Sequence, residues 1–180
     1  IVRSDAAPRE PPGWSGNLPS LGDFASRRLP DTFIQPWDDW LQRGLASGFE
    51  ALGDDWLLHY PTTPTRRFWL ARGLRGTPAW AGLLMPSVDR VGRHFPLSFA
   101  APVSGGADGL AQAIAAHEWY VRLDDCARLV LDVNYEVDEL EAELARLAPW
   151  PSAALAAGDA PAWVGQALLA RRMGKQRIIA

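Results

Sequence analysis

Two short apolar runs separated by a compact polar loop constrain the fold of this chain more than any other feature. The runs are Ala79–Met85 and Leu97–Val103, and each is short and continuously hydrophobic, as expected of a buried β-strand. The loop between them, Pro86–Pro96, is too short for a helical crossover, so we predict that the two strands pair antiparallel. Prolines at both ends of this loop restrict the backbone on either side.

The loop concentrates charged and titratable side chains at the point where the two strands end. These are Asp89, Arg90, Arg93 and His94. Polar groups on loops that a rigid sheet holds in place are where binding and catalysis tend to occur. Asp89 and Arg90 are adjacent, and in extended backbone their side chains point to opposite faces, so we do not expect them to pair. Asp89 can instead reach Arg93 across a turn.

A second turn-rich segment, Gly16–Phe24, carries the acidic residue Asp23. Because Asp23 is opposite in charge to Arg90 and Arg93, we predict that this segment lies beside the loop and that Asp23 pairs with either arginine. Two interpretations of the charge cluster remain open. It is either an ion network that fixes the loop, or a presented surface that recognises a carboxylate, a phosphate or a protein partner, since arginine suits planar anions.

Further strands and helices are predicted around this pair of strands. The other strands cover Trp14–Leu18 and Thr65–Leu70, and helical regions cover Pro30–Gly53, a brief turn at Trp56–Leu57, a segment that starts at Asp108, and Val137–Leu147. Strands interleaved with helices predict an α/β layered sandwich, with a mixed, partly antiparallel sheet flanked by helices. We expect residues 1–12 to form a loose N-terminal arm and residues 13–180 to form a single domain.

Helical spacing predicts which helix faces are buried. In the first helix the apolar stripe comprises Trp37, Trp40, Leu41 and Leu45. In the helix that starts at Asp108, the predicted buried face comprises Leu110, Ile114 and Val121, with Trp119 off that face. The acidic residues Glu139, Glu141 and Glu143 of the last helix are predicted to form a solvated surface.

Composition excludes several functional classes. The formal net charge is -3 and no basic stripe appears, so nucleic acid is not an expected partner. No stretch reaches the ~20 apolar residues of a membrane span, and no signal peptide is visible, so the expected location is the cytoplasm.

The single cysteine, Cys126, excludes an intrachain disulfide and is predicted to be a small buried hydrophobic residue. The nine tryptophans predict an aromatic core; the alternative is that some of them line an interface.

A catalytic interpretation of the loop is weaker than a binding one. Ser87, His94 and Asp89 supply the residue types of a hydrolase, but no nucleophile-elbow glycine pattern surrounds Ser87. Metal-ligand spacings and a glycine-rich phosphate loop are also missing from the sequence. We therefore predict a protein that is not an enzyme and needs no metal or cofactor. The alternative is a small hydrolase or anion-binding domain that uses Asp89, Arg90, Arg93 and His94.

Three blocks of sequence resemble the TagF-type accessory proteins of bacterial type VI secretion. The longest is Met85–Arg93 followed by Phe95–Leu97; the others are Gly16 with Leu18–Ser20 and Gly22–Phe24, and the pair Arg67-Phe68. The resemblance covers roughly the first hundred residues well. Asn17 stands where the family usually has lysine, and His94 where it usually has tyrosine. A tyrosine at that position would not act as a base near neutral pH, which also disfavours a catalytic His94.

The resemblance implies a cytoplasmic regulator that restrains assembly of the secretion apparatus after translation. It implies a protein partner, with a forkhead-associated scaffold of the apparatus as the suggested one. Residues expected to bind the partner or to fix the loop are Gly16, Pro19, Ser20, Gly22, Asp23, Phe24, Ser87, Asp89, Arg90 and Arg93.

Overall fold

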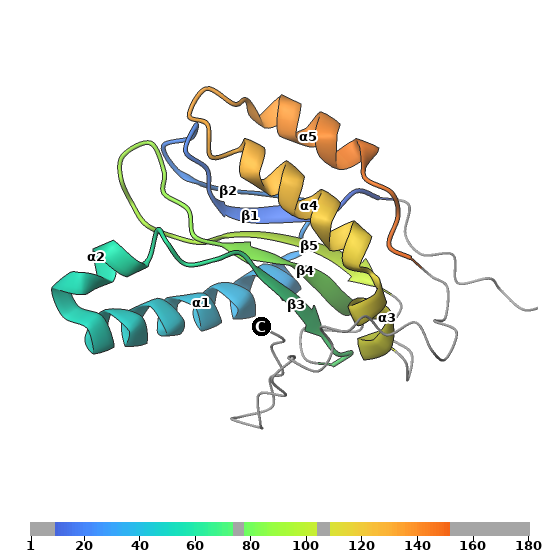
Figure 1. Ribbon diagram of the computed structural model, residues 1–180, viewed down its shortest axis with the longest axis horizontal. Coiled ribbons are helices and arrows are strands. Elements are labelled where there is room, and N and C mark those ends of the chain that lie inside the picture. The colour runs from blue at the N-terminus through green and yellow to red at the C-terminus, as the bar shows by residue number, and fades with distance from the viewer. Residues whose placement is uncertain (1–9, 74–77, 104–108, 152–180) are drawn as a thin grey trace, which may run out of the picture.

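A five-stranded sheet with helices on both faces forms the body of the protein (Figure 1). The computed structural model describes residues 10–73, 78–103 and 109–151. The strands are β1 (Gly13–Asn17), β2 (Phe24–Arg27), β3 (Arg66–Leu70), β4 (Ala79–Met85) and β5 (Leu97–Val103). The helices are α1 (Asp31–Leu52), the 3₁₀ turn η1 (Gly53–Asp55), α2 (Trp56–His59), α3 (Gly109–Ala115), α4 (His117–Leu129) and α5 (Val137–Arg146). The α/β layered sandwich predicted from the sequence is confirmed.

The sheet has the strand order β2-β1-β5-β4-β3, and β4 and β5 begin and end at the predicted residues. The expected mixed sheet is wrong in one respect, because every pairing between these strands is antiparallel. The physical reason lies in the connection through α1. This helix joins β2 to β3, which are the two opposite edges of the sheet, so it crosses a whole face instead of linking two neighbouring parallel strands. Strand β2 was not predicted, since three of its four residues are exposed.

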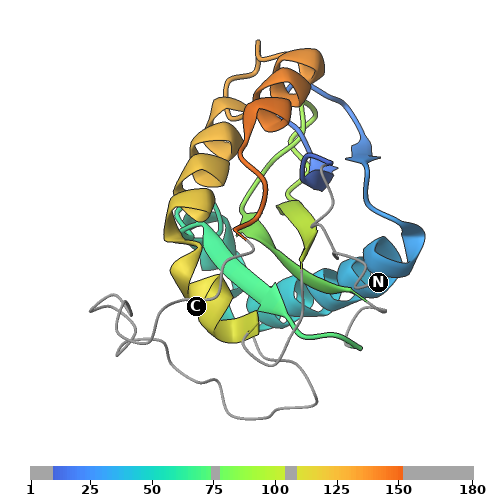
Figure 2. The ribbon, with the colours of Figure 1, turned by 90° about the vertical axis from the view of Figure 1, so that its right-hand side faces the viewer.

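Successive residues of the inner strands point to opposite faces and build two separate cores. On one face, Trp80 of β4 and Phe68 of β3 pack against Phe33 and Trp37 of α1. On the other face, α4 and α5 cover the sheet, so that the molecule has three layers (Figure 2). Burial on both faces explains why β4 and β5 read as continuous apolar runs instead of alternating ones.

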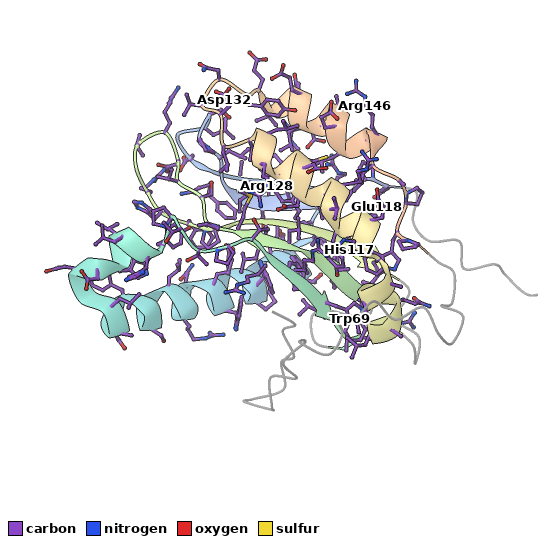
Figure 3. The ribbon with its side chains drawn as sticks, viewed as in Figure 1. Trp69, His117, Glu118, Arg128, Asp132 and Arg146 are labelled. Carbon is purple, nitrogen blue, oxygen red and sulfur yellow. The ribbon has the colours of Figure 1, made fainter. Side chains whose placement is uncertain are left out.

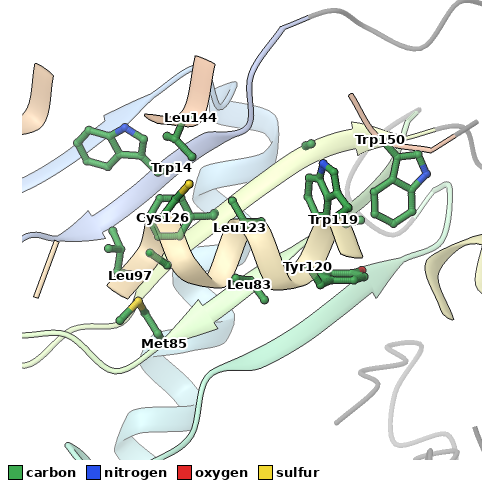
Figure 4. Packing of buried hydrophobic residues seen from close by; sticks show 14 of the residues in the cluster. Trp14, Leu83, Met85, Leu97, Trp119, Tyr120, Leu123, Cys126, Leu144 and Trp150 are labelled. Carbon is green, nitrogen blue, oxygen red and sulfur yellow. The ribbon is translucent and has the colours of Figure 1, made fainter. Parts of the chain in front are cut away.

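The larger core lies between the sheet and helices α4 and α5 (Figure 4). Trp14, Leu83 and Leu97 of the sheet contact this layer, together with Leu123 of α4 and Leu144 of α5. The prediction that Cys126 is buried is confirmed, and burial raises the pKa of its thiol.

The predicted buried face of the helical segment after Asp108 is wrong. The structure breaks this segment at Ala116 into α3 and α4, and Asp108 itself lies outside the described residues. The buried positions Ala113, Ala116, Tyr120 and Leu123 keep helical spacing through the break, so the buried face lies about one position away from the predicted one. Trp119 is therefore buried, while Val121 is only half-buried. Helix α4 also carries two ion pairs between residues one turn apart, Arg122 with Glu118 and Arg128 with Asp124. Figure 3 labels one residue of each pair, Glu118 and Arg128.

Helix α1 is one continuous helix that contains Pro36, and it lies within the predicted helical region Pro30–Gly53. Trp37 and Leu41 are buried as predicted, but Trp40 and Leu45 are only half-buried. The second half of α1 extends beyond the sheet with α2 at its end (Figure 1), so this part of the stripe has less of the sheet to pack against.

Most of the predicted N-terminal arm and residues 152–180 of the predicted domain lie outside the described residues. At the end of the arm, Pro12 is buried, and its carbonyl oxygen accepts a hydrogen bond of 3.0 Å from Arg28 Nη2.

Candidate functional site

The Gly16–Phe24 segment and the Pro86–Pro96 loop lie side by side, as predicted. The Ser87 hydroxyl donates to the Asn17 carbonyl oxygen at 2.7 Å, and Asn17 Nδ2 donates to the Arg93 carbonyl oxygen at 3.0 Å. Further out, the Arg90 backbone N–H donates to the Leu21 carbonyl oxygen at 2.9 Å. These bonds join the strand β1 and its following turn to both ends and the middle of the loop.

A buried carboxylate organises the loop from the inside. The side chain of Asp89 is fully buried. Its Oδ1 accepts hydrogen bonds from the backbone N–H groups of Val91 and Arg93, at 3.0 and 2.8 Å, and its Oδ2 accepts one from Arg93 Nε at 2.6 Å. Two backbone hydrogen bonds of 3.0 Å close the same turn. The Asp89 N–H donates to the Arg93 carbonyl oxygen, and the Gly92 N–H donates to the Asp89 carbonyl oxygen. Both carboxylate oxygens are therefore used in holding the turn.

Arg93 connects this turn to the Gly16–Phe24 segment. Besides Asp89, its guanidinium contacts Asp23 Oδ1 at 3.0 Å and donates to the Gly22 carbonyl oxygen. Of the two arginines that sequence allowed as partners for Asp23, the structure selects Arg93. The Asp23 side chain is 89% exposed, so this outer ion pair contributes little to stability, whereas the pair with the buried Asp89 carboxylate fixes the geometry of the turn.

Ser87 and His94 both make structural contacts at the base of the loop. The Ser87 hydroxyl is buried against Asn17, and Tyr60 brackets the Ser87 backbone, donating to its carbonyl oxygen at 3.0 Å and accepting from its N–H at 3.1 Å. Burial, opposed by the hydrogen bond to Ser87, raises the pKa of Tyr60 to about 12. The ring of His94 instead packs edge-on against Trp56 and Tyr60, with centroid distances of 5.7 and 5.4 Å. Within the described residues, no hydrogen bond links Ser87, His94 and Asp89 into a triad.

The tip of the loop presents one basic and one apolar side chain to solvent. Arg90 is exposed, and within the described part of the chain its guanidinium forms no ion pair or hydrogen bond. Its Nη2 lies near Gly22, 3.6 Å from where a Cβ on that glycine would stand. The neighbouring Val91 is 66% exposed. The sequence does not show which of the two arginines is exposed. In the structure Arg93 is bonded to Asp89, Asp23 and Gly22, whereas Arg90 is exposed.

The comparisons with known proteins assign the chain to a family. Residues 13–147 match the family described as TagF N-terminal domain, Type VI secretion system-associated. The chain belongs to this TagF family. The fold is also similar to the crystal structure of PA0076 from Pseudomonas aeruginosa PAO1, with a TM-score of 0.71 and 40% sequence identity. That likeness covers 78% of this chain and 64% of the other, so this chain spans less than two thirds of its relative. No curated protein matches the sequence.

The remaining TagF-like positions of the Gly16–Phe24 segment shape the turn beside the loop. Gly16 has a φ of 136°, and a Cβ there would stand 2.3 Å from the Pro96 carbonyl oxygen, so this position requires glycine. Pro19 is buried and Ser20 is half-buried in the turn that follows β1. Phe24 is 40% exposed and meets Phe95 of the loop edge-on, at a centroid distance of 5.9 Å. The departure at Asn17 is accommodated, since its amide bonds the loop backbone.

One polar link in this TagF-type domain was missed from the sequence. Glu141 was predicted to be solvated, but its Oε1 accepts a hydrogen bond of 2.7 Å from Nε1 of the buried Trp14, and it forms an ion pair with Arg28. Burial would raise the pKa of Glu141, but the bonds from Arg28 and Trp14 outweigh it and lower that pKa. The link ties α5 to the β1–β2 edge of the sheet. These residues lie 127 and 113 positions apart, and no local pattern marks them.

No group of three or more histidine, cysteine, aspartate or glutamate side chains within the described residues is arranged to hold a metal ion. Among the described helices, none combines the length and the apolar character needed to cross a bilayer.

The Asp89 carboxylate predicts a specific dependence of stability on pH. Burial would raise the pKa of Asp89, but the hydrogen bonds from Arg93 and Val91 dominate and lower it below its ordinary value. Its stabilising contribution is therefore present above the unfolded pKa of about 3.9 and is lost as the pH falls through the lower folded value. Asp89→Asn should destabilise the protein near neutral pH, and the difference from wild type should shrink below about pH 4.

Urea unfolding at a series of pH values measures this effect. Asp23→Asn is the matched control, because the same arginine contacts Asp23 at the surface, and this variant should differ little from wild type at any pH. A deficit of Asp89→Asn that stays constant through acid pH would contradict the assignment to an ionised carboxylate.

Proposed function

We propose that this TagF-family protein is a non-enzymatic regulator that represses type VI secretion after translation, in the bacterial cytoplasm, by binding another protein. A forkhead-associated scaffold of the secretion apparatus is the proposed partner, as the family resemblance implies. The observation that carries the proposal is the loop tip, where unpaired Arg90 and exposed Val91 stand on a turn fixed by the buried Asp89.

The geometry of the tip favours recognition of a protein. Because the turn is already fixed, its backbone loses little conformational freedom on binding, which supports affinity without a deep cavity. Arginine is enriched at binding hot spots, and a neighbouring apolar side chain can shield its contacts from water. The non-enzymatic part of the proposal draws support from Ser87, whose hydroxyl is already bonded, and from His94, which packs against aromatic rings.

Arg90→Ala is expected to weaken binding of the scaffold at least about tenfold, the range typical of an arginine hot spot, and to release secretion from repression in cells. The side chain is exposed and has no described partner, so the variant should keep the wild-type thermal midpoint. Binding is measured by titration calorimetry with the purified scaffold, and repression by the amount of secreted apparatus component in the medium.

His94→Tyr is the matched control, because it installs in the same loop the residue that the family usually carries. It should bind and repress as wild type does. Normal binding and repression by a folded Arg90→Ala protein, together with loss of activity in His94→Tyr, would reject the proposal and favour proton-transfer chemistry at His94.

A further inference from the structure

A narrow apolar groove lies at the base of the loop, between α1 and the ends of β4 and β5. Its volume is about 240 Å³, and its lining includes Trp40, Leu45, Tyr60 and Leu84. Tyr60 is the residue whose hydroxyl brackets the Ser87 backbone, and Pro86 and Pro96 at the two ends of the loop also line the groove. The groove is therefore continuous with the loop surface already described.

Gly44 of α1 lines this groove and has no explanation within the described fold. Glycine inside a helix is less favourable than alanine, because it loses more backbone freedom on folding. Most constrained glycines make room for a neighbour, yet a Cβ on Gly44 would meet no described atom within 4 Å. Its position in α1 needs no positive φ either. A helix interior that keeps a glycine facing open, apolar space is suited to close approach by another molecule.

The charge at the groove indicates what this molecule carries. Arg66 of β3 is the charged residue among the described groove-lining residues. It is exposed, and within the described chain it forms no ion pair or hydrogen bond. A molecule that buries an apolar side chain in the groove binds most tightly when a carboxylate next to that side chain pairs with Arg66.

We propose that the groove at Gly44 receives an apolar side chain of a partner protein, with an adjacent carboxylate that pairs with Arg66. The apolar side chain packs directly against the α1 backbone, where the missing Cβ leaves room. This inference rests on the proposed function only in taking the occupant to be the regulatory partner. It adds a second contact, on α1 and β3, to the one at Arg90.

The direct test uses two short peptides of opposite charge, Ac-Glu-Phe-Glu-NH₂ and Ac-Lys-Phe-Lys-NH₂, titrated into the full chain and followed by amide chemical shifts. The acidic peptide should shift the resonances of Gly44, Leu45 and Leu84 and should bind at least about threefold more tightly than the basic one. Arg66→Glu should reverse this preference. Equal binding of the two peptides, or shifts that avoid the groove, would overturn the proposal.

Filling the groove gives the second test. Gly44→Leu should weaken binding of the acidic peptide at least about tenfold, since the new side chain takes the place of the phenylalanine. The variant should fold with a raised thermal midpoint, because leucine favours helix over glycine and the new Cβ meets no described atom within 4 Å. Ala46→Leu, at an exposed position of the same helix, is the matched control and should bind as wild type does. Unchanged peptide binding in Gly44→Leu would overturn the proposal.

The identity of the occupant is decided with the scaffold itself. Gly44→Leu should also weaken scaffold binding, while normal scaffold binding by this variant would overturn the inference and leave the proposal for Arg90 intact. Analytical ultracentrifugation of the chain alone tests whether the occupant is instead a second copy of this chain. Concentration-dependent dimers that Gly44→Leu abolishes would assign the groove to self-association and overturn the inference as well.

Discussion

Trp37→Ala is expected to lower the free energy of unfolding by about 3–5 kcal/mol, the range for removal of a buried tryptophan. Trp37 is 2% exposed and lies at the centre of the smaller core, with its ring 4.7 Å from that of Phe68 and 5.7 Å from that of Phe33. Its Nε1 also donates to the Ser98 hydroxyl at 2.8 Å. Ser98 is fully buried on β5, so the substitution removes packing and also leaves a buried hydroxyl without this bond.

Urea denaturation of a graded series separates these contributions. Trp37→Phe keeps most of the ring packing but lacks the N–H, so its cost should be about 1–3 kcal/mol. Trp40→Ala is the matched control, since the same helix carries it one turn later in a half-buried position, and its cost should be smaller than that of Trp37→Ala. Since a typical domain is stable by only about 5–15 kcal/mol, Trp37→Ala should remove a large share of the total stability. A wild-type urea midpoint for Trp37→Ala would contradict the assigned packing of α1 on the sheet.

The parts of the fold that sequence predicted are those in which burial leaves a periodic signal. Strands β4 and β5 are covered on both faces, so their limits coincide with the limits of apolar runs. Strand β2 is held by backbone pairing with β1 and has mostly exposed side chains, so it carries no such pattern. The break at Ala116 was missed for a related reason. Buried residues keep their helical spacing through it, and only the non-helical backbone of Ala116 separates α3 from α4.

The candidate site was predicted in its composition and its neighbours but not in its connections. Unlike charges placed Gly16–Phe24 beside the loop, and the turn spacing allowed Asp89 to meet Arg93. Asp23 pairs with Arg93 and not with Arg90 because the two arginine side chains point to different sides of the turn. The hydrogen bonds from the turn backbone to the Asp89 carboxylate set these directions. The groove at Gly44 combines residues from α1, β3 and β4 that no single stretch of sequence brings together.

Gly16→Ala is expected to destabilise the protein and to displace the loop at the same time. The φ of 136° is unfavourable for alanine by about 1–3 kcal/mol. In addition, the new Cβ would stand 2.3 Å from the Pro96 carbonyl oxygen and 2.8 Å from Leu97 Cα. Both are backbone atoms at the start of β5 and cannot rotate away, so β1 and β5 must separate locally, at a further cost of about 1–3 kcal/mol.

This displacement should reach the loop tip, because the bonds that seat the loop begin one residue after Gly16. Separation of the strands pulls Asn17 away from its bonds to Ser87 and Arg93, so the amide shifts of residues 89–92 should change and scaffold binding should weaken. Gly22→Ala is the matched control from the same segment. Its φ is not positive and the nearest atom to its Cβ, at 3.6 Å, is the flexible end of Arg90, so its stability should stay within about 0.5 kcal/mol of wild type. Equal urea midpoints for the two variants would show that the close approach of β1 to Pro96 does not hold the loop in place.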